Sequence, residues 1–324
     1  MCVFCQATDI IEGLFGQVFY HTFQLLPYFY KRRIFPAWEI RSALYGEPPD
    51  FITIPGALDL AYTPPEGHYR RVHLKELRRR HVQILGNDWE ELSRLWHEYF
   101  RVPIRIQQQA DQIFPEGRIL GLHFRGNDKY TSADTTPIQQ EDFLTLVREF
   151  IASSRPFDAI FAATDEFSFV EKLRAAVPLP VVNLGAVDFH KGAVQTAAPK
   201  QRTDRAVLDC VLLSRCICVI QTCSALPSFS KILNPGIEIY RTAASRLFTL
   251  NMPYFPVAYI PVLPVSRPKS RAILDATMVG DWTFEPAARR FKKKFAYRTY
   301  RPLHHTLFTI AEKLGASDLI TVHR

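Results

Sequence analysis

The feature that most constrains the fold is a regular alternation of short apolar runs and longer amphipathic runs between residues 119 and 233. Short apolar runs fit strands that are buried on both faces, whereas the runs between them have the period of helices. The expected strands are 119–124, 159–163, 181–184 and 217–221, and the expected helices are 140–152, 168–176, 204–215 and 224–233. Repeated strand–helix units of these lengths predict a parallel, doubly wound α/β sheet with right-handed crossovers.

Residues 1–117 are different, because glycine, proline and aromatic residues interrupt any such alternation. The glycines at 13 and 16 predict a turn over 12–17, which leads into an apolar helix over 18–30. Residues 81–85 fit a short strand, and 88–112 fit two helices divided near Pro103, or one helix kinked there. Asp88 is a candidate N-cap, since Glu91 follows at the spacing of a capping box.

A turn at 114–117 separates these two parts, so we expect three regions. They are an N-terminal α/β domain over 1–117, a Rossmann-like domain over 118–245 and an irregular, partly helical tail over 246–324. We expect the tail to pack back across both domains. A chain of 324 residues, 47% of them hydrophobic, is long enough to bury so large a core.

The net charge of +8 suits a polyanionic partner, but charge alone does not choose among nucleic acid, an anionic membrane surface and a phosphorylated substrate. Much of the excess lies at 78–81 and 289–294, where a solvated helix face and an anion-binding patch are both open readings. Because no nucleic-acid recognition motif accompanies the charge, we expect no nucleic-acid partner.

The chain starts without the basic and apolar regions of a secretory signal, and no apolar run is long enough to span a membrane. We therefore expect a soluble, cytoplasmic protein that can contact an anionic membrane surface through the basic C-terminal segment; an anchor upstream of residue 1 is the alternative. Six cysteines are too few for a disulfide scaffold. We expect Cys216 and Cys218 to be structural thiols on one face of a buried strand, and no metal site at Cys2-x-x-Cys5, for which no matching ligand pair follows.

Polar residues follow the predicted strands at their carboxyl ends, where doubly wound sheets bind ligands. His123 and Arg125 alternate at the end of the first strand and so face one side. A guanidinium forks onto paired oxygens, which suits a diphosphate. An ion pair between Arg125 and Asp128 would explain the same residue without a ligand.

The last strand runs directly into a helix through the hydroxyl residues Thr222 and Ser224. Free N–H groups at a helix start, together with two hydroxyls, form a site for an anion, although an ordinary N-cap explains one hydroxyl equally well. Asp209 lies on an otherwise apolar helix face, where its carboxylate can accept two N–H bonds from guanine that adenine cannot offer. The alternative for Asp209 is an ion pair with Arg205, one turn earlier.

Together, in this order, these blocks resemble the GDP-fucose fucosyltransferases of the group that contains core α1,6-fucosyltransferase, the rhizobial nodulation fucosyltransferases and the protein O-fucosyltransferases. Residues 123–128 look like their His-x-Arg-x-x-Asp motif, and Thr164-Asp165 resembles their Ala-Thr-Asp strand end. Residues 209–224 resemble their closing block of aspartate, helix, strand and Thr-x-Ser. The resemblance covers roughly residues 118–235, and before them only the glycine loop at 13–17.

The resemblance implies a GT-B fold of two facing Rossmann-like α/β domains and an inverting, metal-independent transfer of fucose from GDP-fucose to a glycan hydroxyl. Arg125 would hold the β-phosphate and serve catalysis, His123 and Asp209 would contact guanosine, and Thr222, Ser224 and Gly16 would complete the donor site. No cofactor or metal is expected, in agreement with the lack of an Asp-x-Asp pair. Acceptor contacts would come mainly from the first domain, where Trp38, Tyr45 and Trp89 either stack on sugar rings or pack in the core.

The chain departs from the family pattern at several positions. Arg125 is followed by Gly126 and not by a second arginine, and Ser224 is followed by Ala225 and not by a second serine. Asp134 stands where the core enzyme has a candidate catalytic glutamate, so it is the candidate base, although a strongly oxocarbenium-like centre needs none. These departures keep two alternatives open: a non-catalytic carbohydrate- or nucleotide-binding protein on the same fold, and a transferase that uses another GDP-sugar.

Overall fold

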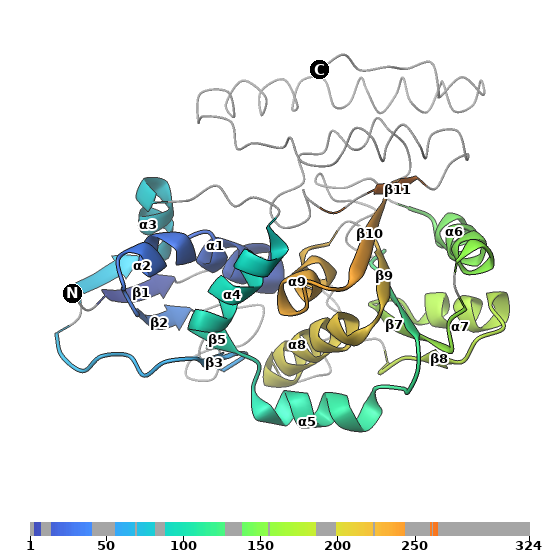
Figure 1. Ribbon diagram of the computed structural model, residues 1–324, viewed down its shortest axis with the longest axis horizontal. Helices are drawn as coiled ribbons and strands as arrows, with labels where there is room; N and C mark the ends of the chain where they lie inside the picture. Colours follow the sequence, from blue (N-terminus) through green and yellow to red (C-terminus); the bar gives the residue numbers. More distant parts are fainter. Residues whose placement is uncertain are drawn as a thin grey trace, which may run out of the picture.

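The computed structural model describes residues 3–7, 14–40, 56–68, 70–81, 88–126, 138–154, 156–185, 199–222, 224–243, 260 and 262–264. These residues form a mixed α/β molecule in which two parallel sheets lie on either side of a helical region (Figure 1).

The larger sheet has six strands and contains every strand predicted from the alternating pattern. In chain order they are β6 (Ile119–Phe124), β7 (Ala159–Thr164), β8 (Val181–Val182), β9 (Cys218–Gln221), β10 (Glu238–Ala243) and β11 (Val262–Pro264). All neighbouring strands are parallel, as the sequence predicts, and their spatial order is β8-β7-β6-β9-β10-β11. Counting β6 as the first strand, this order is 3-2-1-4-5-6, that of the Rossmann sheet.

Helices cover both faces of the larger sheet, so its strands are buried on both sides. On one face Leu120, Leu122 and Phe124 pack in a core with α6 (Gln140–Ser153) and α7 (Phe167–Ala176). On the other face Ile119 and Val219 pack in a second core with α8 (Pro199–Arg215) and α9 (Ala225–Leu233). Burial of both faces explains why these strands are continuous apolar runs and do not alternate with polar residues.

The smaller sheet is parallel too, with the order β2-β1-β4. Its strands are β1 (Val3–Ala7), β2 (Ala37–Ile40) and β4 (Arg70–His73), and its helices are η1 (Leu14–Phe19, π-helical), α1 (Tyr20–Phe23), α2 (Leu26–Lys31) and α3 (Leu74–His81). Two further helices, α4 (Trp89–Tyr99) and α5 (Ile104–Ile113), lead to the larger sheet; β5 (Phe100–Arg101) between them pairs antiparallel with β3 (Asp59–Leu60).

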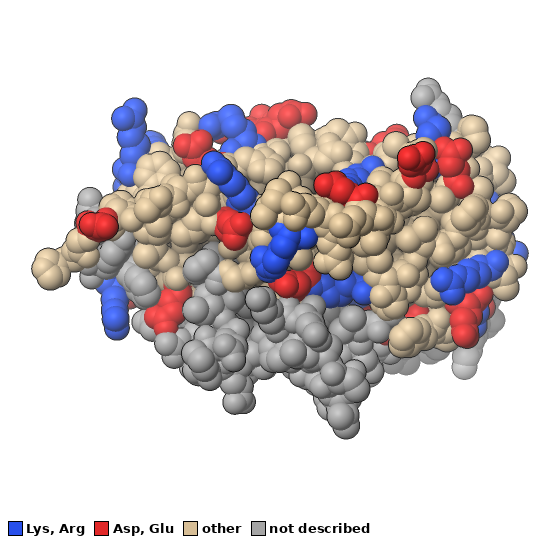
Figure 2. All heavy atoms as spheres, turned by 90° about the horizontal axis from the view of Figure 1, so that it is seen from below, with Lys and Arg blue, Asp and Glu red and all other residues tan. Residues whose placement is uncertain are grey.

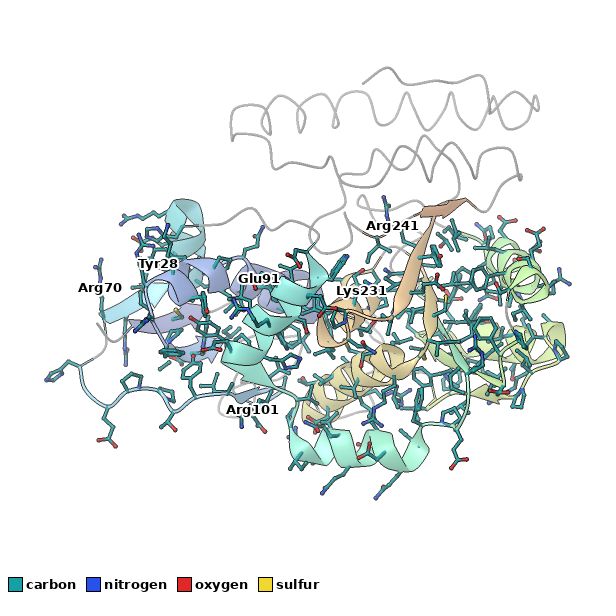
Figure 3. All side chains as sticks on the ribbon, in the orientation of Figure 1. Tyr28, Arg70, Glu91, Arg101, Lys231 and Arg241 are labelled. Carbon is teal, nitrogen blue, oxygen red and sulfur yellow. The ribbon has the colours of Figure 1, made fainter. Side chains whose placement is uncertain are left out.

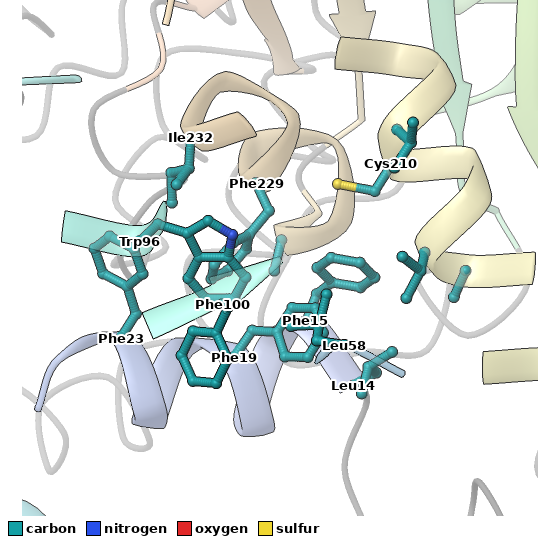
Figure 4. Packing of buried hydrophobic residues seen from close by; sticks show 14 of the residues in the cluster. Leu14, Phe15, Phe19, Phe23, Leu58, Trp96, Phe100, Cys210, Phe229 and Ile232 are labelled. Carbon is teal, nitrogen blue, oxygen red and sulfur yellow. The ribbon is translucent and has the colours of Figure 1, made fainter. Parts of the chain in front are cut away.

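An aromatic cluster joins the two parts of the molecule (Figure 4). Phe229 of α9 lies 5.6 Å from Phe15, 5.7 Å from Phe19, 6.1 Å from Phe23 and 5.9 Å from Trp96, measured between ring centroids. All five rings belong to one core cluster that also contains residues of both sheets. Lys231 of α9 lies beside α4 at the same junction (Figure 3). Its Nζ is 5.9 Å from the ring centroid of Trp89. Trp38 and Trp89 both pack within this core, Trp89 less deeply, which favours the structural reading of these two aromatics.

Predictions for residues 88–112 are confirmed in detail. Two helices, α4 and α5, are separated by Phe100–Arg101 and Pro103. Asp88 caps α4, because its Oδ1 accepts a hydrogen bond of 3.1 Å from the Glu91 backbone N–H.

Other predictions need correction. The turn expected over 12–17 is wrong from Leu14 onward, since Leu14–Phe19 is helical and buries Leu14, Phe15 and Phe19 in the aromatic region of the core. The strand expected from His81 is wrong at its first residue, which ends α3; residues 82–87 lie outside the described part. The irregular structure expected after Arg241 is wrong at two described places, because β10 continues to Ala243 and residues 262–264 form β11. The rest of the tail, with the basic segment 289–294, is outside the described residues.

The cysteine prediction is confirmed in one respect and wrong in another. Cys5, Cys210, Cys216 and Cys218 are buried free thiols, and burial raises the pKa of each. Cys216 and Cys218 do not share a face: Cys216 packs with the core under α8, and Cys218 packs with the core on the opposite side. The reason is that β9 begins only at Cys218, so the period of a strand does not extend back to Cys216.

Charges of both signs are interspersed over the described surface that Figure 2 shows. In the basic segment 78–81, the Arg80 side chain forms an exposed ion pair of 3.1 Å with Glu76, as expected for a solvated helix face. A search of the described helices for one long and apolar enough to cross a membrane finds none.

Candidate nucleotide-binding site

The carboxyl ends of β6 and β9 form the topological switch point of the larger sheet. From β6 the chain continues to β7 and β8 on one side, and from β9 it continues to β10 and β11 on the other. Loops that leave such neighbouring strands diverge, and doubly wound sheets bind their ligands where this happens. The residues that the sequence singles out at 123, 125, 222 and 224 all lie at this point.

Thr222 connects the two strands at the switch point. Its backbone N–H donates to the carbonyl of His123 at 2.9 Å, and its Oγ1 accepts a hydrogen bond of 3.0 Å from the backbone N–H of Arg125. The side chain is buried, so this contact is sheltered from water. Thr222 thus fixes the backbone at Arg125, a role that the sequence does not predict. The contact of Thr222 with phosphate stays a prediction.

The backbone beside Arg125 is fixed from the other neighbouring strand as well. Oδ1 of Asp165, which follows β7, accepts a hydrogen bond of 3.3 Å from the backbone N–H of Gly126. Thr164 organises that turn through its Oγ1, which accepts from the N–H of Glu166 at 3.1 Å. Arg125 therefore starts from a backbone held on both sides, with a half-buried side chain. The alternative ion pair with Asp128 lies outside the described residues, as does Asp134.

His123 lies on the face of β6 that α8 covers. The face is identified by Gly121, two residues earlier, where an added Cβ would meet side-chain atoms of Val219, Cys216 and Leu213 at 2.9 to 3.1 Å. His123 is only 6% exposed and lies opposite Gln221 in the β6–β9 register.

Gln221 is a buried polar residue that the sequence reasoning did not select. Its Nε2 donates to Ser228 Oγ at 2.8 Å, and Ser228 Oγ donates in turn to the carbonyl of Ser224 at 2.9 Å. The Gln221 Oε1 atom accepts no hydrogen bond from any described residue. A glutamine that ends an otherwise apolar strand was the available signal, because a buried amide usually satisfies both of its ends.

Ser224 is the residue that precedes α9, in the N-cap position. Its backbone is extended, with φ −145° and ψ 146°, and its side chain makes no capping hydrogen bond. Because the hydroxyl leaves the first N–H groups of α9 unoccupied by a cap, the helix start keeps donors for an anion. Pro227 in the first turn has no N–H and removes one of them.

Asp209 forms the ion pair that was the alternative to a ligand contact. Its Oδ1 accepts a hydrogen bond of 3.1 Å from Arg205 Nε, and both side chains are largely buried, at 12% and 14% exposed. Burial raises the pKa of the Asp209 carboxyl above its ordinary value, and the charge of Arg205 opposes the rise. The predicted contact of Asp209 with guanosine stays a prediction.

Gly16 belongs to η1 and not to a loop. The segment packs against α9, the helix that begins at the switch point, through Phe15 and Phe19 on Phe229. This contact brings the glycine-containing segment to the helix that carries Ser224, while a direct role for Gly16 in ligand binding stays a prediction. Among the described residues, no group of three histidine, cysteine, aspartate or glutamate side chains could hold a metal ion.

Comparisons with known proteins find similarity among solved structures only. No family model matches the chain, and no curated protein matches it in sequence. Among solved structures, the chain is similar to the fucosyltransferase NodZ from Bradyrhizobium, with 15% identity, coverage of 72% of this chain and 94% of that chain, and a TM-score of 0.47. It is also similar to POFUT1 in complex with GDP-fucose, with 9% identity, coverage of 73% and 97%, and a TM-score of 0.45.

A structure of NodZ alpha-1,6-fucosyltransferase soaked with GDP-fucose is similar at 14% identity, with coverage of 72% and 92% and a TM-score of 0.45. These similarities are weak in both sequence and structure, with identities of 9% to 15% and TM-scores of 0.45 to 0.47.

Proposed function

We propose that this protein is a glycosyltransferase that transfers fucose from GDP-fucose to a hydroxyl group of a glycan or glycoconjugate. The observation that carries the proposal is the position of Arg125 at the switch point of a 3-2-1-4-5-6 sheet, where Thr222 accepts from its N–H and Asp165 accepts from the N–H of Gly126. A permanently charged fork that extends from a fixed backbone suits a diphosphate, and the start of α9 supplies further donors beside it.

We further propose that the reaction is independent of metal and inverts the configuration at the sugar, as the resemblance in the sequence implies. The difficult step is departure of GDP from the anomeric carbon, during which negative charge grows on the β-phosphate. Arg125 and the first N–H groups of α9 would stabilise that charge without a metal ion. Asp134 is the candidate base for the acceptor hydroxyl, and a dissociative transition state would lower the demand on any base.

In the arrangement that we propose, the two parallel sheets are the cores of the two Rossmann-like domains of a GT-B fold. The larger sheet would bind the donor, and the N-terminal part would supply most acceptor contacts. Helices α4 and α9 and the aromatic cluster would form the junction between them.

Calorimetric titration with GDP tests the donor site. The unaltered protein should bind GDP, and Arg125→Ala should bind it about 10- to 100-fold more weakly, since a hydrogen bond to a charged group contributes about 1.5–3 kcal/mol. The matched control is Arg118→Ala, at the opposite end of β6, where Arg118 Nε donates to the carbonyl of Pro156. The control should leave GDP affinity unchanged. Equal affinities for GDP in all three proteins would contradict the proposal.

Turnover distinguishes an enzyme from a binding protein on the same fold. We expect slow release of GDP from GDP-fucose by the unaltered protein and none by Arg125→Ala. Binding of GDP without release from GDP-fucose, GDP-mannose or other GDP-sugars, with or without a glycan panel, would favour the non-catalytic alternative. If GDP were released only from a different GDP-sugar, the protein would still be a glycosyltransferase, but its donor would not be GDP-fucose.

A further inference from the structure

Arg205 makes more contacts than an ordinary helix-surface ion pair requires. Its Nε donates to Asp209 at 3.1 Å, its Nη1 to the carbonyl of Leu184 at 2.7 Å and its Nη2 to the carbonyl of Gly185 at 2.7 Å. One guanidinium thus uses all three nitrogens to join α8 to the segment that follows β8. A lysine could not reproduce this geometry, because its donors all lie on one nitrogen, whereas the guanidinium spreads its donors over three nitrogens in a planar fork.

The segment after β8 is itself built around a second side chain. Asn183 Nδ2 donates to the carbonyl of Ala162 in β7 at 2.6 Å, and its Oδ1 accepts from the N–H of Gly185 at 2.8 Å. Gly185 has a φ of +88°, which favours glycine at this place. The result is a hydrogen-bonded support at the carboxyl edge of the sheet, which Arg205 joins to Asp209.

The charge balance at Asp209 gives Arg205 a further consequence. Burial raises the pKa of this carboxyl and thereby favours its neutral form, whereas the charge and hydrogen bond of Arg205 favour the ionised form. The distinction matters for guanine, because an ionised carboxylate accepts both the N1–H and the 2-amino N–H, while a protonated one presents an O–H in place of one acceptor.

Other titratable groups on the described elements around α8 are engaged elsewhere or lie on the sheet. Arg105 and Asp111 of α5 are paired with Asp204 and Arg215 of α8. Lys231 of α9 donates to the carbonyls of Pro235 and Ile237. His123 lies on the side of β6 that faces α8. Cys210 follows Asp209 in the chain, and burial raises the pKa of its thiol, which is thereby kept neutral.

We propose that Arg205 is a positioning residue that holds the Asp209 carboxylate in place, and so determines the preference of the site for guanine over adenine nucleotides. This inference rests on the proposed function, since it takes the ligand to be a GDP-sugar. Arg205 itself contacts protein groups; it acts on the nucleobase through Asp209 and the Asn183–Gly185 support.

The test measures affinity for GDP and ADP between pH 5.5 and 8.5 in the full chain. In the unaltered protein GDP should bind more tightly than ADP, and its affinity should fall as Asp209 becomes protonated at low pH. In Arg205→Met the pKa of Asp209 rises further, so this fall should begin at higher pH. We expect a loss of about tenfold in GDP affinity at the acidic end of the pH range, with a much smaller loss for ADP.

Three further variants separate positioning from a general effect on folding. Arg205→Lys keeps the charge and should restore much of the pH profile while it loses the two carbonyl contacts. Asp209→Asn cannot titrate in this range and should remove the pH step in both backgrounds. Arg215→Met is the matched control on the same helix, paired with Asp111 at 2.6 Å, and should leave both nucleotides and the pH profile unchanged.

The outcomes are distinguishable. GDP affinity that falls equally at every pH in Arg205→Met, in parallel with ADP, would show that Arg205 only stabilises the fold and would overturn the inference alone. If Arg205→Met does not fold, the other two variants decide. The inference would be overturned if Arg205→Lys and Asp209→Asn both kept the GDP-to-ADP affinity ratio and the pH profile of the unaltered protein. Failure of the unaltered protein to bind GDP would overturn the proposed function and the inference with it.

Discussion

The two parallel sheets of this molecule differ in how much of their surface is covered. Every residue of β6 and β9 in the larger sheet is buried, whereas three of the four residues of β4 in the smaller sheet are exposed and β2 alternates between buried and half-buried positions. A sheet covered on both faces can present polar groups only where its strands end. Candidate ligand contacts therefore gather at the carboxyl edge of the larger sheet, while the smaller sheet leaves side chains such as Arg70 and His73 exposed along a strand.

The difference in cover does not make the two sheets independent, because one aromatic cluster packs between them. Phe229 tests this with the largest expected effect. Phe229→Ala should lower the free energy of unfolding by about 3–5 kcal/mol, because it removes a buried ring that contacts η1, α1 and α4 together. Urea unfolding followed by tryptophan fluorescence should show one transition, shifted to lower urea.

Phe167→Ala is the control for Phe229, since it is the same substitution at a side chain that is 65% exposed. We expect it to change stability by no more than about 0.5 kcal/mol. Hydrogen exchange completes the comparison: if Phe229→Ala weakened protection in the larger sheet and left the smaller sheet as it was, the two sheets would be separate folding units and the idea of a shared core would be wrong.

Gly121 tests how closely α8 is packed on the larger sheet. A Cβ at this position would lie 3.1 Å from Leu213 Cδ2 of α8 and 2.9 Å from Val219 Cγ2 of β9, both tighter than ordinary Cβ contacts. Gly121→Ala should therefore destabilise the protein by about 1–3 kcal/mol through overpacking, and should also weaken GDP binding because His123 follows two residues later.

Thermal unfolding measures the effect of Gly121→Ala, with Gly236→Ala as the control in an open turn, where the nearest atom to an added Cβ is 3.3 Å away on the Asn234 side chain. A melting temperature for Gly121→Ala equal to that of the control would mean that α8 can move away from the sheet with little loss of folding free energy.

Asp88 gives the smallest of these effects, on a helix that lies between the two sheets. Asp88→Ala removes the cap of α4 and should cost about 1 kcal/mol. Chemical denaturation should show the loss, and Glu116→Ala, an exposed acid in a loop, should show almost none. Because α4 bears Trp96 of the shared cluster, a loss confined to the smaller sheet in hydrogen exchange would argue against coupling through this helix.

The sequence predicted the larger sheet well and the smaller one poorly, for a physical reason. Strands β6, β7 and β9 are continuous apolar runs because both of their faces are buried, and such runs are visible in one dimension. Strand β4 is Arg-Arg-Val-His, whose place in a sheet depends on parallel pairing with β1, a contact between distant parts of the chain. The glycines at 13 and 16 predict a turn where η1 is helical, because the burial of Phe15 depends on distant residues and is not visible in the local pattern.

The candidate site shows the same division between position and role. Residues 123, 125, 222 and 224 were placed at the strand ends because alternation and strand length locate such ends. Their bonds could not be predicted: the Thr222 hydroxyl binds a backbone N–H of another strand, and Arg205 binds two carbonyls after β8, so both depend on the register and crossovers of the folded sheet. The sequence does not show the role of Gln221, because its amide bonds Ser228, whose position depends on how α9 packs on the sheet.

The contact between Arg125 and Thr222 also has a consequence for the order of folding. Its two partners are 97 residues apart in the chain, and the strands β7 and β8 with their helices lie between them. Strands β6, β7 and β8 can pair over shorter loops, whereas β9 reaches β6 only after α8 has crossed the sheet. A growing chain on the ribosome therefore completes the candidate site only once the start of α9 has emerged, so that the nucleotide binding that we propose would mark a late step in the maturation of this protein.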